Sequence, residues 1–141
     1  MPCITVPLDP LGPIIEIGIA LPGGFPRPNP PPPIQWIKAI ADTGCTHTSI
    51  HNSVAAALGL TVLSKGIANT ASGPAPANIY HGDLFLRPLI GGKQFEWLFN
   101  DRQLLELAQN HAKYDALLGM DILSQGLFSV NGALNSATFC W

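Results

Sequence analysis

An apolar run leads directly into an Asp-Thr-Gly turn in the segment Trp36-Ile37-Lys38-Ala39-Ile40-Ala41-Asp42-Thr43-Gly44-Cys45-Thr46-His47-Thr48-Ser49-Ile50. The run from Ile37 to Ala41 is apolar except for Lys38, and we expect it to end a β-strand that begins at Ile34. An acid at the end of such a strand is held on a rigid element while its carboxylate faces a cleft. Asp42 is therefore the first candidate for a catalytic residue. The simpler alternative is an Asp that only forms a local turn with Thr43 and Gly44.

A second motif, Ala116-Leu117-Leu118-Gly119-Met120-Asp121-Ile122-Leu123, occurs later in the chain. It joins an apolar pair and a Gly to a helix-like start. With both motifs in this order, the chain resembles the retropepsin-like (retroviral-type) aspartic proteases across residues 14–130, and bacterial or retroelement-like members more than viral ones. The resemblance implies a mostly β, closed, barrel-like acid protease fold with one or two short helices and a flap hairpin.

The resemblance also implies roles for individual residues. Asp42 is the expected catalytic aspartate, Thr43 bonds across a dimer through its hydroxyl, and Gly44 lets substrate backbone lie close. The expected substrate-binding residues lie on the same loop and on the flap: Cys45, Thr46, Thr48, Ala71, Ser72, Gly73, Pro74 and Ala75. The expected structural motif behind the loop consists of Leu117, Leu118, Gly119 and Asp121. From its position alone, Asp121 is expected to cap a helix.

The number of motifs predicts an assembly. The sequence has one Asp-Thr-Gly and no Asp-Ser-Gly, whereas this chemistry needs two carboxylates that share a proton around a water molecule. We therefore expect a homodimer in which Asp42 meets its copy across a two-fold axis. The expected activity is that of an aspartic endopeptidase on polypeptide substrates, with no cofactor and no metal.

A few positions depart from the family pattern. Cys45 stands where Ala or Ser is common. Met120 and Thr46 occupy the places of an Arg and an acid that pair in viral members, which leaves the strength of the dimer open. Pro74 and Pro76 remove backbone donors that a flap offers to substrate.

Prolines crowd residues 22–33, between strands expected at residues 14–21 and 34–41. We interpret this segment as a loop insertion within a single domain, residues 1–141. Residues 27–33 fit the Arg-x-x-Pro-x-x-Pro pattern of ligands for aromatic-lined grooves. The alternative function is therefore a weak or inactive protease-like dimeric scaffold that binds a protein partner through this loop. A stiff solvent-exposed loop is the simpler interpretation.

The remaining pattern predicts further elements. A helix is expected within residues 50–60, capped by Asn52 or Ser53 and ended by Gly59. Expected strands cover residues 61–67, 79–86, 93–99, 114–118 and 137–141, with a helical turn at 101–108, a short helix at 121–125 and a hairpin at 128–134. An apolar pocket lined by Ile50, Ile79 and the flap is expected.

Composition narrows the function classes. Charged residues make up 11% and hydrophobic residues 47% of the chain, which suggests that a partner or a second copy covers part of the surface. A net charge of −2 gives no basic footprint for nucleic acid. No run is long enough to cross a membrane. The first residues lack the pattern of a secretory signal, so a cytoplasmic location is expected.

The cysteines and histidines have alternative interpretations. With an odd number of cysteines, we expect reduced thiols, although Cys3 and Cys140 could approach each other if the termini share a sheet. Cys45, His47 and His51 could suggest a metal site. The stretch between the histidines is β-branched and turn-like, however, and a further ligand would be needed. We therefore expect histidines that lie on the surface or line a cleft.

Overall fold

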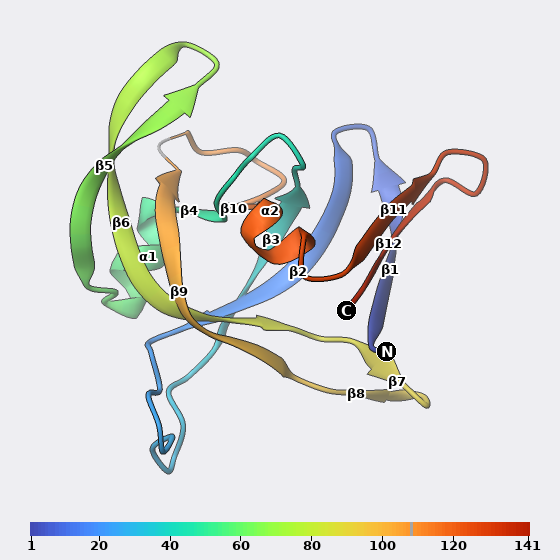
Figure 1. Cartoon of the computed structure of the whole chain (residues 1–141), viewed down its shortest axis with the longest axis horizontal. Coiled ribbons are helices and arrows are strands. Elements are labelled where there is room, and N and C mark those ends of the chain that lie inside the picture. Colours follow the sequence, from blue (N-terminus) through green and yellow to red (C-terminus); the bar gives the residue numbers. More distant parts are fainter. Residues whose placement is uncertain (108) are drawn as a thin grey trace.

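Strands dominate the computed structural model, which describes residues 1–107 and 109–141. The strands are β1 (Cys3–Asp9), β2 (Gly12–Ala20), β3 (Gln35–Ala41), β4 (Ser49–His51), β5 (Val62–Thr70), β6 (Gly73–Leu86), β7 (Leu89–Ile90), β8 (Lys93–Gln94), β9 (Trp97–Leu107), β10 (Ala116–Leu118), β11 (Leu127–Asn131) and β12 (Ser136–Cys140). In the described ranges, two short helices accompany them: α1 (Asn52–Leu58) and α2 (Met120–Leu123). The mostly β class predicted from the sequence is confirmed (Figure 1).

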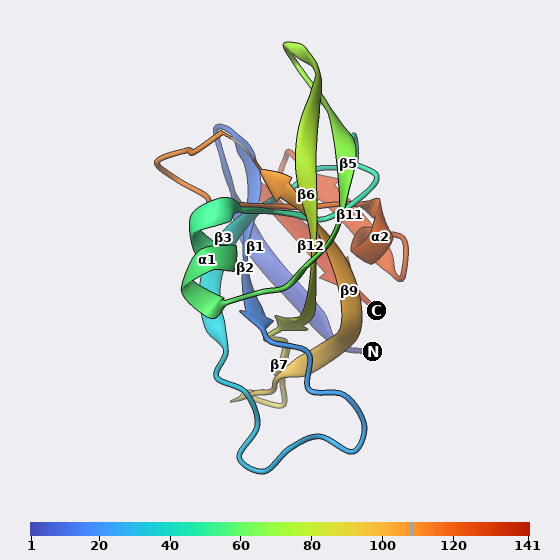
Figure 2. The same cartoon turned by 90° about the vertical axis from the view of Figure 1, so that its left-hand side faces the viewer.

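One large sheet organises the chain. Its strand order is β11-β12-β1-β2-β3-β10-β4-β9-β6-β5, and an additional pairing of β2 with β6 joins part of this run into a ring. The ring is the barrel-like part of the fold. The β5–β6 hairpin and the loop of residues 21–34, which connects β2 to β3, project from opposite ends of the molecule (Figures 1 and 2).

The core lies within this ring. Ile15, Ile17 and Ile19 of β2 are buried at every second position, as the period of a strand requires. They form one cluster with large side chains of the neighbouring elements: Ile37, Ile50, Leu84, Leu104, Leu118, Ile122 and Phe139. One apolar interior therefore stabilises both ends of the barrel, from which the loops extend.

The first helix begins one residue earlier than predicted. His51 is its N-cap, and the Nδ1 of His51 accepts a hydrogen bond from the Ser53 N–H at 3.3 Å. The predicted cap at Asn52 or Ser53 is therefore wrong. Gly59 ends the helix in the left-handed region at φ 67°, as expected. In the part of the chain that the structure describes, no helix combines the length and apolar character needed to cross a membrane.

The helical turn predicted for residues 101–108 is wrong. Residues 101–107 belong to β9, and Ala108 lies outside the described residues. Leu104 and Leu105 pair with Tyr80 and Ile79 of β6, and Leu104 is fully buried. Pairing with a neighbouring strand and burial of alternate side chains decide the conformation here, because strand formation depends strongly on tertiary context.

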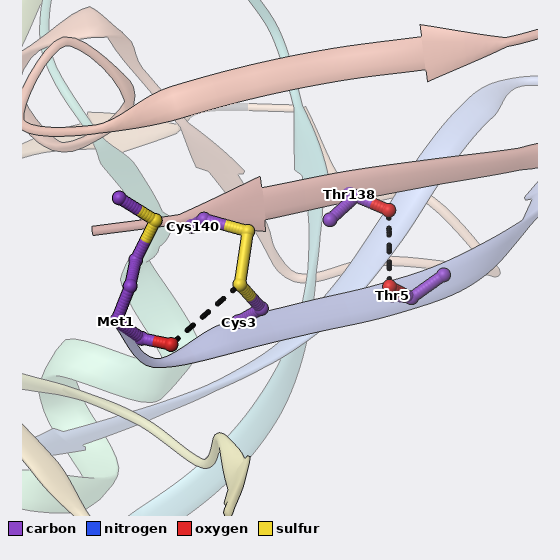
Figure 3. Close-up of a disulfide and its surroundings, with 5 residues drawn as sticks. All are labelled: Met1, Cys3, Thr5, Thr138 and Cys140. Carbon is purple, nitrogen blue, oxygen red and sulfur yellow. Dashed lines mark hydrogen bonds between the residues drawn. A yellow bond between two sulfur atoms is a disulfide. The ribbon is translucent and has the colours of Figure 1, made fainter.

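The two termini form one ladder. β1 pairs antiparallel with β12, and β12 pairs with β11. Cys3 lies opposite Cys140, and the two residues form a disulfide (Figure 3). The expectation of reduced thiols is therefore wrong for this pair, because a shared sheet brings together residues from opposite ends of the chain. Cys45 is a free thiol.

Candidate active site

Asp42 lies at the end of β3, where the chain leaves the barrel. Its backbone N–H donates to the Leu118 carbonyl at 3.0 Å. The Gly44 N–H donates to Asp42 Oδ1 at 2.8 Å. A Cβ at position 44 would lie 3.1 Å from the same oxygen, so glycine leaves this oxygen uncrowded. The carboxylate is thus held in one orientation yet only half-buried, and Thr43 beside it is exposed.

Cys45 contacts the other oxygen of this carboxylate. Its Sγ donates to Asp42 Oδ2 at 3.2 Å. Burial raises the pKa of the Cys45 thiol to about 11, and the hydrogen bond and negative charge of Asp42 act in the same direction. The group beside Asp42 is therefore a neutral thiol that donates a hydrogen bond.

The strand β10 lies in the sheet between β3 and β4, the two strands that flank the loop carrying Asp42. It pairs in parallel with β3 on one side and antiparallel with β4 on the other. Leu117 and Leu118 belong to this strand, and Gly119 follows it. A Cβ at Gly119 would lie 2.6 Å from the carbonyl carbon of His47. The close approach of two backbones therefore requires glycine at this position.

Thr48 and Asp121 join the two motifs from inside. The Thr48 N–H and hydroxyl both donate to Asp121 Oδ1, at 2.9 and 2.8 Å. The same hydroxyl accepts the Gly119 N–H at 3.1 Å. Thr48 is 0% exposed, so the predicted direct contact of Thr48 with substrate is wrong in this structure. Because its carboxylate is used here, Asp121 does not cap α2, whose N-cap is Gly119.

Backbone hydrogen bonds connect the segment of Cys45 and Thr46 to the first turn of α2. The Met120 N–H donates to the Cys45 carbonyl at 2.8 Å. The Asp121 N–H donates to the Thr46 carbonyl at 3.1 Å. The first turn of α2 therefore supports the loop of residues 42–48, here called the Asp42 loop, through these two backbone hydrogen bonds as well as through the carboxylate of Asp121.

The expected flap is the hairpin of β5 and β6. Thr70 pairs with Gly73, leaving Ala71 and Ser72 as the exposed tip. Gly73 adopts a positive φ of 112°. The Thr70 hydroxyl donates to the Gly73 carbonyl at 2.7 Å. Pro74, Ala75 and Pro76 belong to β6 and lie outside this tip.

Both prolines of this hairpin lie in the part of the β5–β6 ladder that has regular register. Pro74 lies opposite Asn69 and Pro76 opposite Ile67. Since proline has no N–H, its nitrogen must face away from the partner strand. Residues two apart present their nitrogens to the same edge, so both prolines remove donors from the outer edge of β6.

A hollow lies between the Asp42 loop and the base of the flap. It has a volume of about 140 Å³ and is lined by His47, Gly66, Ile67, Ile79, Gln103 and Leu105. Of the predicted pocket residues, Ile79 lines it. Ile50 is fully buried in the core, so its predicted place in the pocket is wrong. In the described part of the chain, residues 71–75 do not line this hollow.

Residues 35–122, which include the Asp-Thr-Gly turn and all but the last residue of the second motif, match the family model described as aspartyl protease. The chain belongs to the aspartyl protease family. No curated protein matches its sequence.

Two solved structures are similar to this chain. A retropepsin-like aspartic protease from Rickettsia conorii is similar with a TM-score of 0.55 and 17% identity, covering 97% of this aspartyl protease chain and 89% of that chain. The retroviral protease-like domain of Ddi1 from Leishmania major has a TM-score of 0.44 and 16% identity, over 89% of this chain and 87% of that chain. The first similarity confirms the retropepsin-like fold expected from the sequence.

Sequence reasoning missed most residues of the hollow in this aspartyl protease. His47 was expected to lie on the surface or line a cleft, and it does line one. Ile67 offered a weak signal in the sequence, because it is a β-branched residue within an expected strand. In the structure its side chain is 72% exposed. Gln103 and Leu105 had no signal in the sequence, since we expect residues 101–108 to be helical and not to face the β5–β6 hairpin.

A larger hollow lies at the proline-rich loop. It has a volume of about 430 Å³, and its lining includes Arg27, Pro31, Phe85, Glu96 and Leu98. Arg27 is fixed there, because its guanidinium lies 3.4 Å from the buried carboxylate of Asp83 and over the ring of Phe85. This part of the aspartyl protease is remote from the Asp42 loop (Figures 1 and 2).

Proposed function

We propose that this chain is an aspartic endopeptidase that acts as a homodimer, with Asp42 of each copy facing the other across a two-fold axis. The observation that carries the proposal is the fixed carboxylate of Asp42. One oxygen accepts the Gly44 N–H and the other accepts the Cys45 thiol, at the end of a strand anchored in the core. A carboxylate ordered in this way but still partly open to solvent suits general acid–base chemistry.

The chemistry requires the second copy. One aspartate, ionised, takes a proton from the water that attacks the scissile carbonyl carbon. The other, protonated, donates its proton to the carbonyl oxygen, which gives a tetrahedral intermediate. As the C–N bond breaks, the first aspartate passes its proton to the leaving amine and the second takes back the hydroxyl proton, so the shared proton is restored. Two carboxylates this close share a single proton, and their pKa values belong to the pair. We expect activity to fall as the pH rises and this shared proton is lost.

The hollow beside the Asp42 loop has room for an apolar side chain of the substrate. Ile67, Ile79 and Leu105 provide most of its surface, with His47 and Gln103 as polar neighbours. We therefore propose that polypeptides with hydrophobic residues near the cleaved bond are the substrates. The β5–β6 hairpin serves as the flap that excludes water from the bound peptide.

The test is the Asp42→Asn variant in cleavage of a peptide library. We expect loss of cleavage with unchanged folding and sedimentation, because Asn has nearly the same shape but cannot exchange the proton. Asp101→Asn is the matched control, since Asp101 is exposed on β9 and has a φ of 52° that Asn tolerates. Cleavage by Asp42→Asn at the wild-type rate would remove Asp42 from the proposed role.

A second candidate function is a dimeric scaffold that binds a protein partner through residues 27–33. The observation in its favour is the hollow of about 430 Å³ beside Arg27, which is the right size for a ligand group. Replacing the prolines between Pro28 and Pro33 by Gly and Ser should leave peptide cleavage intact and abolish partner binding. Loss of cleavage in this variant would instead connect the loop to the catalytic site.

A further inference from the structure

A buried carboxylate, Asp83, holds the proline-rich loop of residues 21–34 against the barrel, at the end opposite the β5–β6 hairpin (Figures 1 and 2). Asp83 is 1% exposed. One of its oxygens accepts the Gly23 N–H and the other accepts the Asp101 N–H, both at 3.0 Å. A buried charge is costly unless it is hydrogen-bonded. The fold therefore keeps this loop in place through a carboxylate that the proposed catalytic mechanism does not use.

The same carboxylate helps to position Arg27 of the loop. Arg27 Nη1 lies 3.4 Å from Asp83 Oδ2, and the guanidinium lies over the ring of Phe85, at 5.3 Å from its centroid. A Cβ at Gly23 would lie 3.1 Å from Cζ, Nε and Nη2 of Arg27, so glycine lets the loop backbone lie against the cation. Three neighbours therefore fix the orientation of the guanidinium.

The hydrogen-bonding capacity of Arg27 is only partly used within the chain. Within residues 1–107 and 109–141, the contact with Asp83 is the only ion pair that Arg27 makes, and Nη1 alone makes it. A guanidinium has several further N–H donors. The side chain is 30% exposed and lines the hollow of about 430 Å³ at the proline-rich loop, here called the loop hollow. Donors of Arg27 are therefore open to a ligand in this hollow.

The other walls of the loop hollow are mostly apolar. Phe85 and Leu98 lie opposite each other on β6 and β9, and they line the hollow together with Ile34, Pro31 and Pro32. Sites for small molecules have this composition, in which apolar walls hold the body of the ligand and a few polar groups orient it. The volume of the loop hollow lies in the range of such sites.

The charges around the loop hollow favour an anion. Glu96 also lines it, but Glu96 is exposed, so water and salt screen its charge. Arg27 is more enclosed and is held in one orientation. A planar guanidinium matches the two oxygens of a carboxylate, whereas a phosphate among mostly apolar walls would lack further donors. The charge and shape of the hollow therefore point to a carboxylate with an apolar body.

We infer that the loop hollow is a binding site for a small apolar carboxylate. The carboxylate binds Arg27, and the apolar body packs against Phe85, Leu98 and the loop prolines. The site is separate from the Asp42 loop and does not depend on the proposed endopeptidase activity. Residues 27–33 form a wall of this site, whereas the second candidate function makes them a ligand for a protein partner.

The first experiment uses the wild-type chain and three small ligands with the same apolar body. Octanoate carries a carboxylate, octan-1-ol an uncharged hydroxyl and octylamine a cation. In isothermal titration calorimetry, octanoate should bind saturably, and the other two should bind about tenfold or more weakly, because they lack the charge-assisted hydrogen bonds to Arg27. No saturable binding of octanoate, or equally tight binding of octan-1-ol, would overturn the inference.

The second experiment removes the cation. Arg27→Met nearly keeps the length of the side chain and should weaken octanoate binding by about tenfold or more. Arg87→Met is the matched control, because Arg87 also pairs with an acid, Glu16, and lies over an aromatic ring, that of Trp36. In the described part of the chain, Arg87 does not line the loop hollow. Unchanged octanoate binding by Arg27→Met would place the acid elsewhere and overturn the inference.

A third variant tests the sign of the charge on the ligand. Glu96→Gln removes a negative charge from the rim and should strengthen octanoate binding by about two- to fivefold, as expected for an exposed charge. Because Glu96 is exposed, this variant keeps the inference testable if Arg27→Met does not fold in circular dichroism. Weaker octanoate binding by Glu96→Gln would count against an anionic ligand.

A peptide identifies the source of the carboxylate. The tripeptide Gly-Gly-Leu has an apolar last residue with a free carboxylate, and its C-terminal amide is the control. Tighter binding of the tripeptide than of octanoate, lost in the amide, would support the C-terminus of a polypeptide as the natural ligand. Tighter binding of octanoate would support a free acid.

The outcomes separate this inference from the proposed function. Asp42→Asn should bind octanoate as the wild type does, because the loop hollow is remote from Asp42. Octanoate binding in a wild type that cleaves no peptide would support the loop hollow and count against the endopeptidase. Cleavage that depends on Asp42, without octanoate binding, would support the endopeptidase and overturn the loop hollow as a site.

Discussion

The Thr48 hydroxyl lies 2.8 Å from Asp121 Oδ1, although the two residues are separated by 73 positions in the chain. This buried contact connects the loop that carries Asp42 to the helix α2, which forms the second half of the second motif. The hydroxyl is both a hydrogen-bond donor, to Asp121, and an acceptor, from the Gly119 N–H at 3.1 Å. The two motifs are therefore one structural unit, and their separation in sequence conceals it.

Removing this hydroxyl should destabilise the protein. Thr48→Val keeps the shape of the side chain but leaves the buried Gly119 N–H without its acceptor, at a cost of about 1–3 kcal/mol in the free energy of unfolding. Urea denaturation measures the change, and Thr46→Val at an exposed position should have little effect. Equal stability of Thr48→Val and wild type would show that water or a rearranged loop satisfies the group.

A methyl group at Gly119 should disturb the Asp42 loop. Gly119→Ala brings a Cβ to 2.6 Å from the carbonyl carbon of His47, and backbone atoms cannot move aside as a flexible side chain does. We expect a loss of about 1–3 kcal/mol or more in the free energy of unfolding, together with reduced cleavage. Gly132→Ala is the control, because no heavy atom lies within 4 Å of its Cβ. Comparable stability of both variants would contradict the close packing described above.

The Cys45 thiol should resist alkylation at neutral and mildly alkaline pH. The thiolate is the reactive form, and burial together with Asp42 raises its pKa to about 11. The rate of reaction with iodoacetamide, followed by mass spectrometry, should therefore keep rising up to pH 10, beyond the range where an ordinary thiol levels off. Asp42→Asn should increase the rate at pH 8, since it removes a negative charge that disfavours the thiolate.

Two controls define the alkylation experiment. The protein unfolded in urea should show Cys45 reacting like an ordinary thiol, because burial is lost. Cys3 and Cys140 should remain unlabelled in the native protein, as their sulfurs are bonded to each other. A native Cys45 that reacts as fast as the unfolded one at pH 8 would contradict the burial of the thiol.

The disulfide should contribute substantially to stability. It closes a loop with a sequence separation of 137 residues, and cross-links across long loops restrict the unfolded chain most in the chain-entropy account. The double variant Cys3→Ser and Cys140→Ser should lose about 2–5 kcal/mol in the free energy of unfolding. Reductant should weaken the wild type by a similar amount and leave the double variant unchanged. A wild type insensitive to reductant would argue that the bond is absent in solution.

The sequence was most informative where structure is local. The alternating isoleucines of residues 14–21 predict a strand, and Gly59 predicts the end of a helix, because side-chain period and backbone freedom are properties of a few neighbouring residues. The retropepsin-like fold was predicted differently, from a resemblance to a family that the order of the two distant motifs carries. The conformation of residues 101–107 could not be predicted in this way, because their leucines lie in a strand that forms by pairing with β6.

Within the candidate site, the sequence by itself identified Asp42, placed it at the end of a strand and predicted that one motif leaves the site half complete. Only the tertiary structure decided that Thr48 is buried against Asp121, that Cys45 donates to Asp42, and that Cys3 meets Cys140. These contacts join residues through the sheet and the turns around it, and their geometry follows from how the whole chain packs. A carboxylate can be named from its neighbours in sequence, but its hydrogen-bond partners depend on which segments the core brings together.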